Sequence, residues 1–186
     1  MIFGWEMPAS MTQFFNPFFI ILFGSIFSIM WVKLSQIGKN PSIPLKFCFG
    51  IVQLALGFLL TKLGFQFVNE AYQVPILTLV FLYMLHTTGE LFLSPIGLSM
   101  VTKLSPKSMA GTAMGAWFLS FAIANYAGGK IAAITGGHGG EEAVNAEAGL
   151  LQYLDVFSTI GYVLLIIAAI IFLLNKPIKK LMHGVE

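Results

Sequence analysis

Residues 71–102 read AYQVPILTLVFLYMLHTTGELFLSPIGLSMVT and carry a single charged side chain, that of Glu90. A helix of about 20 mostly apolar residues crosses the hydrocarbon core of a bilayer, so this stretch is long enough to span it. At a rise of about 1.5 Å per residue, Glu90 lies near the bilayer midplane. A carboxylate at that depth is costly unless it faces a cavity or a polar partner. The stretch therefore predicts a membrane helix with a functional or a structural acid at its centre.

The rest of the chain has the same apolar character. Hydrophobic residues make up 57% of its 186 residues and charged residues 10%, against about 25% charged residues in soluble domains. The net charge of +2 is too small to indicate a nucleic-acid partner, and the lone cysteine, Cys48, indicates no disulfide. The sequence indicates no cofactor, metal site or enzyme activity. We predict an all-α polytopic membrane protein with five transmembrane helices, at about residues 14–34, 46–68, 73–104, 107–131 and 152–175.

The lysines are unevenly distributed over the connections between these spans. Eight of the ten lie between the first and second spans, between the third and fourth, or after the fifth: Lys33, Lys39, Lys46, Lys103, Lys107, Lys176, Lys179 and Lys180. Cytoplasmic loops of membrane proteins are enriched in lysine and arginine, so these three places are expected to be cytoplasmic. We therefore expect a multi-pass protein of the bacterial inner membrane, with its N-terminus outside and its C-terminus in the cytoplasm.

The N-terminal segment gives no reason for an external start. Residues 1–13 have neither a basic n-region nor a cleavage pattern that would translocate them. We expect that a further helix precedes Met1 and that the chain is a fragment of a larger protein. The alternative is a protein whose N-terminus is outside and which is inserted by its first long span.

Two interpretations of Glu90 follow from its depth. As a functional group it would relay protons or contact a polar substrate; as a structural group it would accept a hydrogen bond from a neighbouring helix. His86 lies one helical turn earlier, where we expect it within hydrogen-bonding reach of Glu90. Residues four apart are weak evidence for a metal site, and we predict none here.

The residues that follow Glu90 predict a bend. Pro95 has no amide hydrogen for the Leu91 carbonyl, and its ring clashes with that carbonyl. Gly89 and Gly97 flank the stretch, which also contains Ser94. We predict a gating hinge formed by Gly89, Ser94, Pro95 and Gly97, with a static proline kink as the alternative.

Other spans contribute aromatic and small residues. Trp117 and Phe118 lie about 15 Å into the fourth span, which is too deep for the interfacial aromatic belt, so they either pack or line a pocket. Asn16 and Pro17 begin the first span. Gly50, Gly57 and Gly64 recur at heptad spacing in the second span, and this small-residue face is expected to pack against another helix.

Several stretches together resemble the proton-dependent oligopeptide transporters. Residues 89–98, GELFLSPIGL, residues 101–106, VTKLSP, and residues 114–119, MGAWFL, with Gly111, resemble the tenth and eleventh helices of that family. Residues 14–21, FFNPFFII, with Trp31, resemble its eighth helix. Pro44, Lys46, Phe47 and Gly50 are similar to the start of its ninth helix.

The resemblance implies a major facilitator fold of two six-helix halves, with this chain supplying five helices of the C-terminal half. It also implies that Asn16, Glu90, Trp117 and Phe118 line a peptide site, where Glu90 receives the peptide's amino terminus. The implied activity is symport of di- and tripeptides with protons. Its partners are small peptides, protons, the lipid bilayer and the N-terminal helices that this chain lacks.

Parts of the family's mechanism do not match any residue here. The N-terminal acid-and-arginine proton motif and the acid on the family's seventh helix are absent, and the chain has no arginine. Two other functions stay open: a non-transporting membrane module with a structural Glu90, and a facilitator for another solute.

Overall fold

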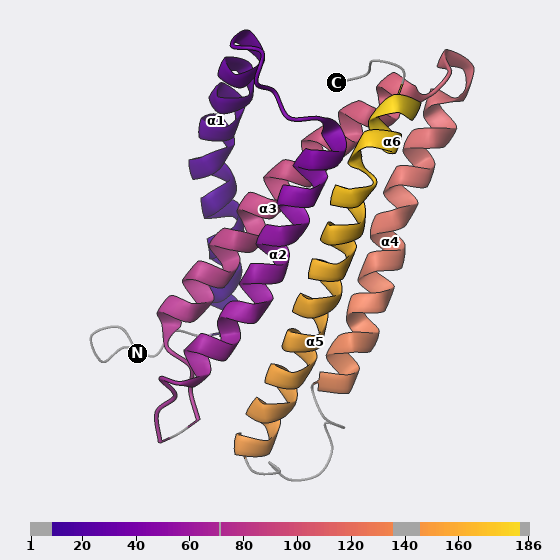
Figure 1. Cartoon of the computed structure of the whole chain (residues 1–186). Coiled ribbons are helices and arrows are strands. Elements are labelled where there is room, and N and C mark those ends of the chain that lie inside the picture. Colours follow the sequence, from indigo (N-terminus) through magenta and orange to yellow (C-terminus); the bar gives the residue numbers. More distant parts are fainter. Residues whose placement is uncertain (1–8, 71, 136–145, 183–186) are drawn as a thin grey trace.

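The computed structural model describes residues 9–70, 72–135 and 146–182, and all regular structure in these ranges is helical. Two short 3₁₀ helices, η1 and η2, accompany six α-helices, α1 to α6 (Figure 1). The bounds are Ala9–Phe14 for η1, Phe15–Gln36 for α1, Ile43–Phe65 for α2, Ile76–Leu104 for α3, Lys107–Met109 for η2, Ala110–Thr135 for α4, Ala146–Leu173 for α5 and Asn175–Leu181 for α6. The predicted all-α class is confirmed.

Four helical segments within the described ranges are long and apolar enough to cross a membrane. They are Met11–Gln36, Ile43–Phe65, Ile76–Leu104 and Glu147–Leu173. Helix α4 lies over the fourth predicted span and runs alongside α5 (Figure 1). It is 26 residues long, is not one of these four segments, and includes Asn125 and Lys130. Its membrane crossing, like the exact limits of the other spans, stays a prediction.

The local sequence explains where α1 ends and where α2 begins. Gly38 adopts a φ of +68° just beyond α1, which glycine tolerates at a helix C-terminus, and its amide donates to the Ser35 carbonyl. Pro44 lies in the first turn of α2, where its missing amide hydrogen is not needed. Helix α2 therefore begins before Lys46, whose ammonium lies 4.7 Å from the centroid of the Trp31 ring.

The small-residue face of α2 packs against α3, as the heptad spacing predicted. A Cβ at Gly50 would lie 2.9 Å from the Gly89 carbonyl oxygen, and a Cβ at Gly57 would lie 2.7 Å from His86 Nε2. At Gly64 the neighbour is Thr78. Only glycine permits this approach, and close backbone packing is the main source of attraction between helices in lipid.

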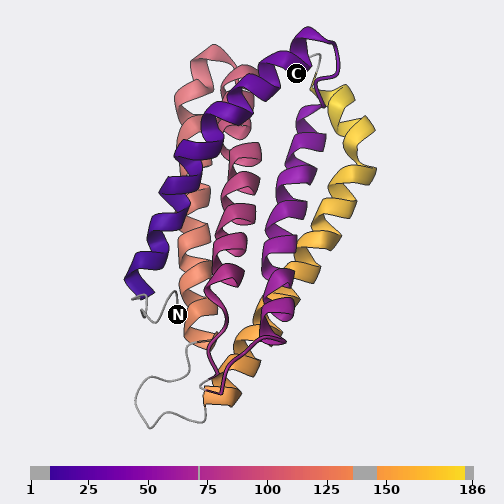
Figure 2. The ribbon, with the colours of Figure 1, turned by 90° about the vertical axis from the view of Figure 1, so that its left-hand side faces the viewer.

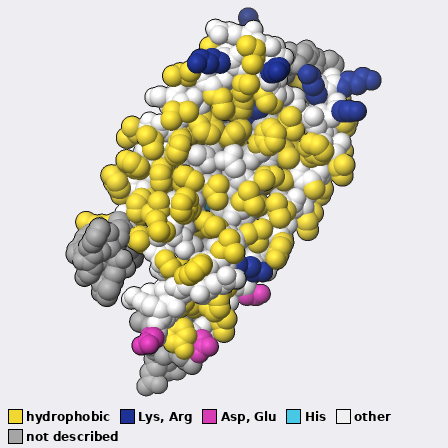
Figure 3. All heavy atoms as spheres, turned by 60° about the vertical axis from the view of Figure 1, so that its left-hand side comes forward, with side chains coloured by type: hydrophobic (Ala, Val, Ile, Leu, Met, Phe, Trp, Pro, Cys, Tyr) yellow, Lys and Arg dark blue, Asp and Glu magenta, His cyan; other side chains and the backbone are white. Residues whose placement is uncertain are grey.

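The helices form a bundle with α2 between α3 and α5, while α1 packs on the other side of α3 (Figures 1 and 2). Helices α1 and α4 are the least enclosed: Phe19 is the one buried residue of α1, and no described side chain of α4 is buried. Apolar side chains cover the surface seen in Figure 3, with most basic side chains gathered at one end and the acidic ones at the other. This distribution matches a bundle surrounded by lipid and further helices.

Candidate functional site

The central acid of α3 meets a polar residue of α1. The Asn16 side-chain amide donates to Thr87 Oγ1 at 3.2 Å and to Glu90 Oε2 at 3.4 Å. Thr87 is fully buried, and it lies on α3 one turn before Glu90. Two residues that the resemblance assigned to one site, Asn16 and Glu90, are therefore in contact.

Aromatic packing holds α1 against α3 and so sets the position of Asn16. The rings of Phe15 and Tyr83 have centroids 6.0 Å apart on one side of the polar contact. On the other side, the Phe92 ring lies edge-on to both Phe27 and Trp31, with centroid distances of 5.1 Å. These distances are typical of favourable edge-to-face and tilted pairs. The two aromatic clusters bracket the Asn16 contact along the length of the helices.

Glu90 keeps acceptor capacity for a further partner. Its side chain is exposed, and its polar partner on α1 is a neutral amide. Within the three described ranges, Glu90 makes no ion pair. A carboxylate has two oxygens with about four acceptor positions, of which Asn16 occupies one. The remaining positions can accept a proton or the hydrogens of an ammonium group.

His86 does not hydrogen-bond to Glu90, although the two residues lie four positions apart on α3. Its ring packs against Phe58 of α2, with a centroid distance of 4.5 Å, and it bonds to the backbone of Leu54. Its Nε2 is buried without a hydrogen-bond partner. The reason is rotational: one side of α3 faces the glycines of α2, and Glu90 is turned toward α1. The predicted hydrogen bond between His86 and Glu90 is wrong.

Trp117 packs against α3 farther along the helix. Its indole occupies the space that the missing side chain of Gly97 leaves, beside Phe47. It also borders a pocket of about 340 Å³ between α2, α3 and α4, lined by Phe47, Ile51, Leu93, Ser94, Trp117, Ser120, Phe121 and Ala124. Gly97 lies two turns beyond Glu90, or about 10 Å along the helix. Trp117 therefore contacts α3 at Gly97 and shares a pocket with Ser94, on the part of α3 that follows Glu90.

Phe118 has a different environment. It is 58% exposed, and its ring lies 6.2 Å from that of Phe121 on the same helix. In the described part of the chain, neither a hydrogen bond nor a ring contact joins Phe118 to Glu90 or Asn16. Phe118 therefore stands apart from the contact that brings Asn16 and Glu90 together.

The predicted hinge residues take part in helix packing. Helix α3 continues through Pro95 to Leu104, and Gly89 lies against the Gly50 carbonyl and the Leu54 side chain. Gly97 accommodates Trp117. These two glycines thus allow close contact with α2 and α4, and the hinge stays a prediction.

Thr87 is a member of the site that the sequence did not predict. Its signal was a hydroxyl three residues before Glu90, in the short polar stretch HTTGE (residues 86–90) of a mostly apolar helix. Residues three apart lie on one side of a helix, so the same neighbouring side chain can reach both. Asn16 does so in the structure.

Comparisons with known proteins identify relatives over the whole chain. The dipeptide and tripeptide permease A of Edwardsiella piscicida is 36% identical over 183 residues, covering 98% of this chain and 36% of the permease. The peptide transporter YePEPT of Yersinia enterocolitica is 37% identical over 189 residues, covering 100% of this chain and 35% of that transporter. The chain therefore spans about a third of the length of these relatives.

Solved structures show the same fold. A crystal structure of peptide transporter POT in complex with sulfate superposes with a TM-score of 0.81 at 31% identity, over 98% of this chain and 34% of that one. A mutant of peptide transporter POT in complex with alafosfalin gives a TM-score of 0.73 at 29% identity, over 99% and 35%. The major facilitator fold is thereby confirmed. The model of the POT family matches residues 1–143, and the chain belongs to that family.

Proposed function

We propose that this chain forms five helices of the C-terminal half of a proton-coupled symporter of di- and tripeptides. The observation that carries the proposal is the contact between Asn16, in the first turn of α1, and Glu90, at the middle of α3; both helices are apolar. Membership of the POT family supports it, as do relatives named as dipeptide and tripeptide permeases. In this mechanism the chain moves its substrate without changing it chemically, and it needs no cofactor.

Glu90 would bind the amino terminus of the peptide. A carboxylate and an ammonium group form a charge-assisted hydrogen bond, which is about twice as strong as a neutral one. Asn16 donates to one carboxylate oxygen and so fixes the orientation in which the other meets the ligand. Protonation of Glu90 would remove the attraction and release the peptide. Trp117 and Phe118 would supply apolar surface to peptide side chains, with Trp117 placed through Gly97.

The rest of the transporter would pack against the open faces of this bundle. Gly111 and Gly115 on α4 have nothing within 4 Å of the position that a Cβ would take, among the described residues. Small residues on a membrane helix suit close contact with another helix. Alternating access requires two halves that rock about a shared site, so the N-terminal half would supply the opposite wall and the remaining proton-coupling groups.

The charge distribution supports an orientation for the bundle. Basic side chains gather at one end of the face seen in Figure 3. The loops between α1 and α2 and between α3 and α4, together with the adjoining helix ends and α6, contain eight lysines. Under the positive-inside rule this end lies in the cytoplasm, so α1 runs from the outer side toward the cytoplasm and the loop between α2 and α3 lies at the outer face of a bacterial inner membrane.

Uptake of a dipeptide into proteoliposomes tests the proposal. The full-length transporter is compared with its Glu90→Gln variant under an imposed proton gradient. We expect proton-driven uptake in the parent and its loss in the variant, because the amide cannot ionise. Glu147→Gln is the matched control, since Glu147 is an exposed acid that bonds to Tyr72 far from the site. Unchanged uptake by Glu90→Gln would leave Glu90 a structural role only.

A further inference from the structure

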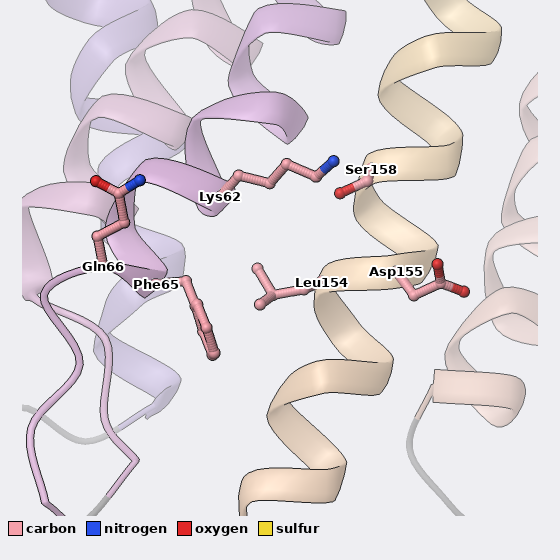
Figure 4. Close-up of a pocket in the computed structure, with 6 residues that line it drawn as sticks. All are labelled: Lys62, Phe65, Gln66, Leu154, Asp155 and Ser158. Atoms are coloured by element: carbon pink, nitrogen blue, oxygen red, sulfur yellow. The ribbon is translucent and has the colours of Figure 1, made fainter.

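A second polar cluster lies between α2 and α5, away from Glu90. It surrounds a pocket of about 480 Å³ lined by Lys62, Phe65, Gln66, Leu154, Asp155 and Ser158 (Figure 4). Lys62 is in the last turn of α2, at the end opposite the lysine-rich loops. The mechanism proposed for peptide transport uses none of these residues.

One side of the pocket presents hydrogen-bond donors around a positive charge. Lys62 Nζ donates to the Tyr162 hydroxyl at 3.2 Å, and it lies 5.0 Å from the centroid of the same ring. Ser158 is 5% exposed, and its Oγ has no hydrogen-bond partner. Figure 4 shows the Ser158 hydroxyl and the Lys62 ammonium directed toward each other across the pocket. A buried hydroxyl without a partner is unusual and indicates that a polar group completes the site.

The residues that line the pocket also include an acid. Asp155 lies one turn before Ser158 on α5 and is exposed. Its carboxylate points away from Lys62 in Figure 4, and within the described ranges no ion pair joins the two. A simple anion would be attracted by Lys62 and repelled by Asp155. A ligand that carries both a negative and a positive group satisfies both.

We propose that this pocket binds the headgroup of a zwitterionic phospholipid that has a primary amine, as phosphatidylethanolamine has. The phosphate accepts hydrogen bonds from Lys62 and Ser158, and the ammonium donates to Asp155. A quaternary choline has no N–H to donate, so the site distinguishes the two headgroups through Asp155.

The surroundings favour a lipid over a soluble phosphate. Phe65 and Leu154 give the pocket an apolar wall. Tyr162, Ile166 and Ile170 continue from Ser158 along α5 at four-residue spacing, and they are 52%, 60% and 50% exposed. Residues four apart lie on one face of a helix, so this stripe offers an apolar path for an acyl chain along α5. A soluble phosphate compound would gain nothing from that stripe.

Native mass spectrometry of the full-length transporter in detergent tests the site. The protein is titrated with phosphatidylethanolamine and phosphatidylcholine of the same acyl chains, and with inorganic phosphate. We expect the ethanolamine lipid to bind about tenfold more tightly than the choline lipid, as one charge-assisted hydrogen bond implies. Asp155→Asn should abolish this preference, and Lys62→Gln should weaken both lipids.

The controls separate this site from general charge effects. Lys130 is also near a tyrosine ring, 5.6 Å from the centroid of Tyr126, so Lys130→Gln is the matched variant and should bind both lipids as the parent does. If Lys62→Gln does not fold, Tyr162→Phe takes its place in the experiment. This variant keeps the ring and removes only the hydroxyl that Lys62 contacts. Equal binding of the two lipids, a preference that survives Asp155→Asn, or inorganic phosphate that binds as tightly as the lipid would each overturn the proposal.

Discussion

Asn16 of α1 lies within hydrogen-bonding distance of Glu90 of α3, with 3.4 Å between Nδ2 and Oε2 and 74 positions between them in the chain. The same amide bonds to the buried Thr87, so the asparagine is held at two points on α3. A carboxylate at the middle of α3 thus receives a neutral donor from within the chain. Its other acceptor positions are left for a charged or protonated partner.

Removal of the Asn16 amide should weaken peptide binding. Asn16→Ala leaves Glu90 without its donor, and we expect the KM for dipeptide uptake to rise about tenfold, the equivalent of roughly 1.4 kcal/mol. Initial uptake rates over a range of dipeptide concentrations measure the effect. Asn125→Ala is the control, because that amide bonds to its own helix at the Phe121 carbonyl and is exposed. An unchanged KM in Asn16→Ala would argue against the positioning role.

The contact between α2 and α3 should not tolerate a methyl group at Gly50, where the two backbones meet. In Gly50→Ala, the new Cβ would lie 2.8 Å from Leu93 Cγ and 2.9 Å from the Gly89 carbonyl oxygen. We expect a loss of about 1–3 kcal/mol in the free energy of unfolding, as for overpacked cores. Thermal unfolding in detergent gives the measurement. Gly24→Ala should not lower Tm, since Gly24 has nothing within 4 Å of that position among the described residues.

The hinge prediction can be tested at Pro95. Pro95→Ala restores an amide that can bond to the Leu91 carbonyl, and it removes the ring that clashes there. If α3 bends during transport, this variant should be more stable to heat and should transport more slowly, with a lower kcat. The two readouts are Tm and the maximal uptake rate. Parental transport together with a raised Tm would show that the proline makes a static kink.

Tyr72 should titrate at unusually high pH. Its hydroxyl donates to Glu147 Oε2 at 3.0 Å, and this hydrogen bond and the carboxylate's negative charge raise the pKa of Tyr72 above its ordinary value of 10.0. Because the folded-state pKa is raised, the stabilisation is complete below pH 10 and is lost as the pH rises through the folded-state value. Tyrosinate absorbance, as the difference between parent and Tyr72→Phe, follows this group. Glu147→Gln should shift that difference curve to lower pH, and a curve that does not move would refute the contact.

The sequence predicted features that depend on one helix at a time. The heptad spacing of Gly50, Gly57 and Gly64 correctly indicated a contact face, because helical periodicity alone places these residues together. Features that depend on how helices rotate against one another were harder to predict. His86 shares a face with Glu90 by spacing, yet it packs against Phe58, because the glycine face of α2 approaches that side of α3.

The candidate site was predicted in part, and by resemblance more than by physical reasoning. Depth alone singled out Glu90, whereas the pairing with Asn16 followed from the family pattern, since nothing in the first span reveals which helix it contacts. The packing of Trp117 into the space left by Gly97 was not predicted, because spacing within one helix does not reveal which neighbouring side chain fills the gap beside a glycine. Lys62 lies near the end of the second predicted span, and the sequence of that span does not reveal which α5 residues are its neighbours.

Binding of a peptide's amino terminus is the role assigned to Glu90, and calorimetry measures it without the other steps of transport. Isothermal titration of the full-length transporter compares alanyl-alanine with its N-acetyl derivative, in the parent and in Glu90→Gln. We expect the parent to bind the free amine at least about tenfold more tightly, as a charge-assisted hydrogen bond requires, and Glu90→Gln to bind the two ligands equally. A preference for the free amine that survives in Glu90→Gln would rule out this role, because another group would then receive the amino terminus.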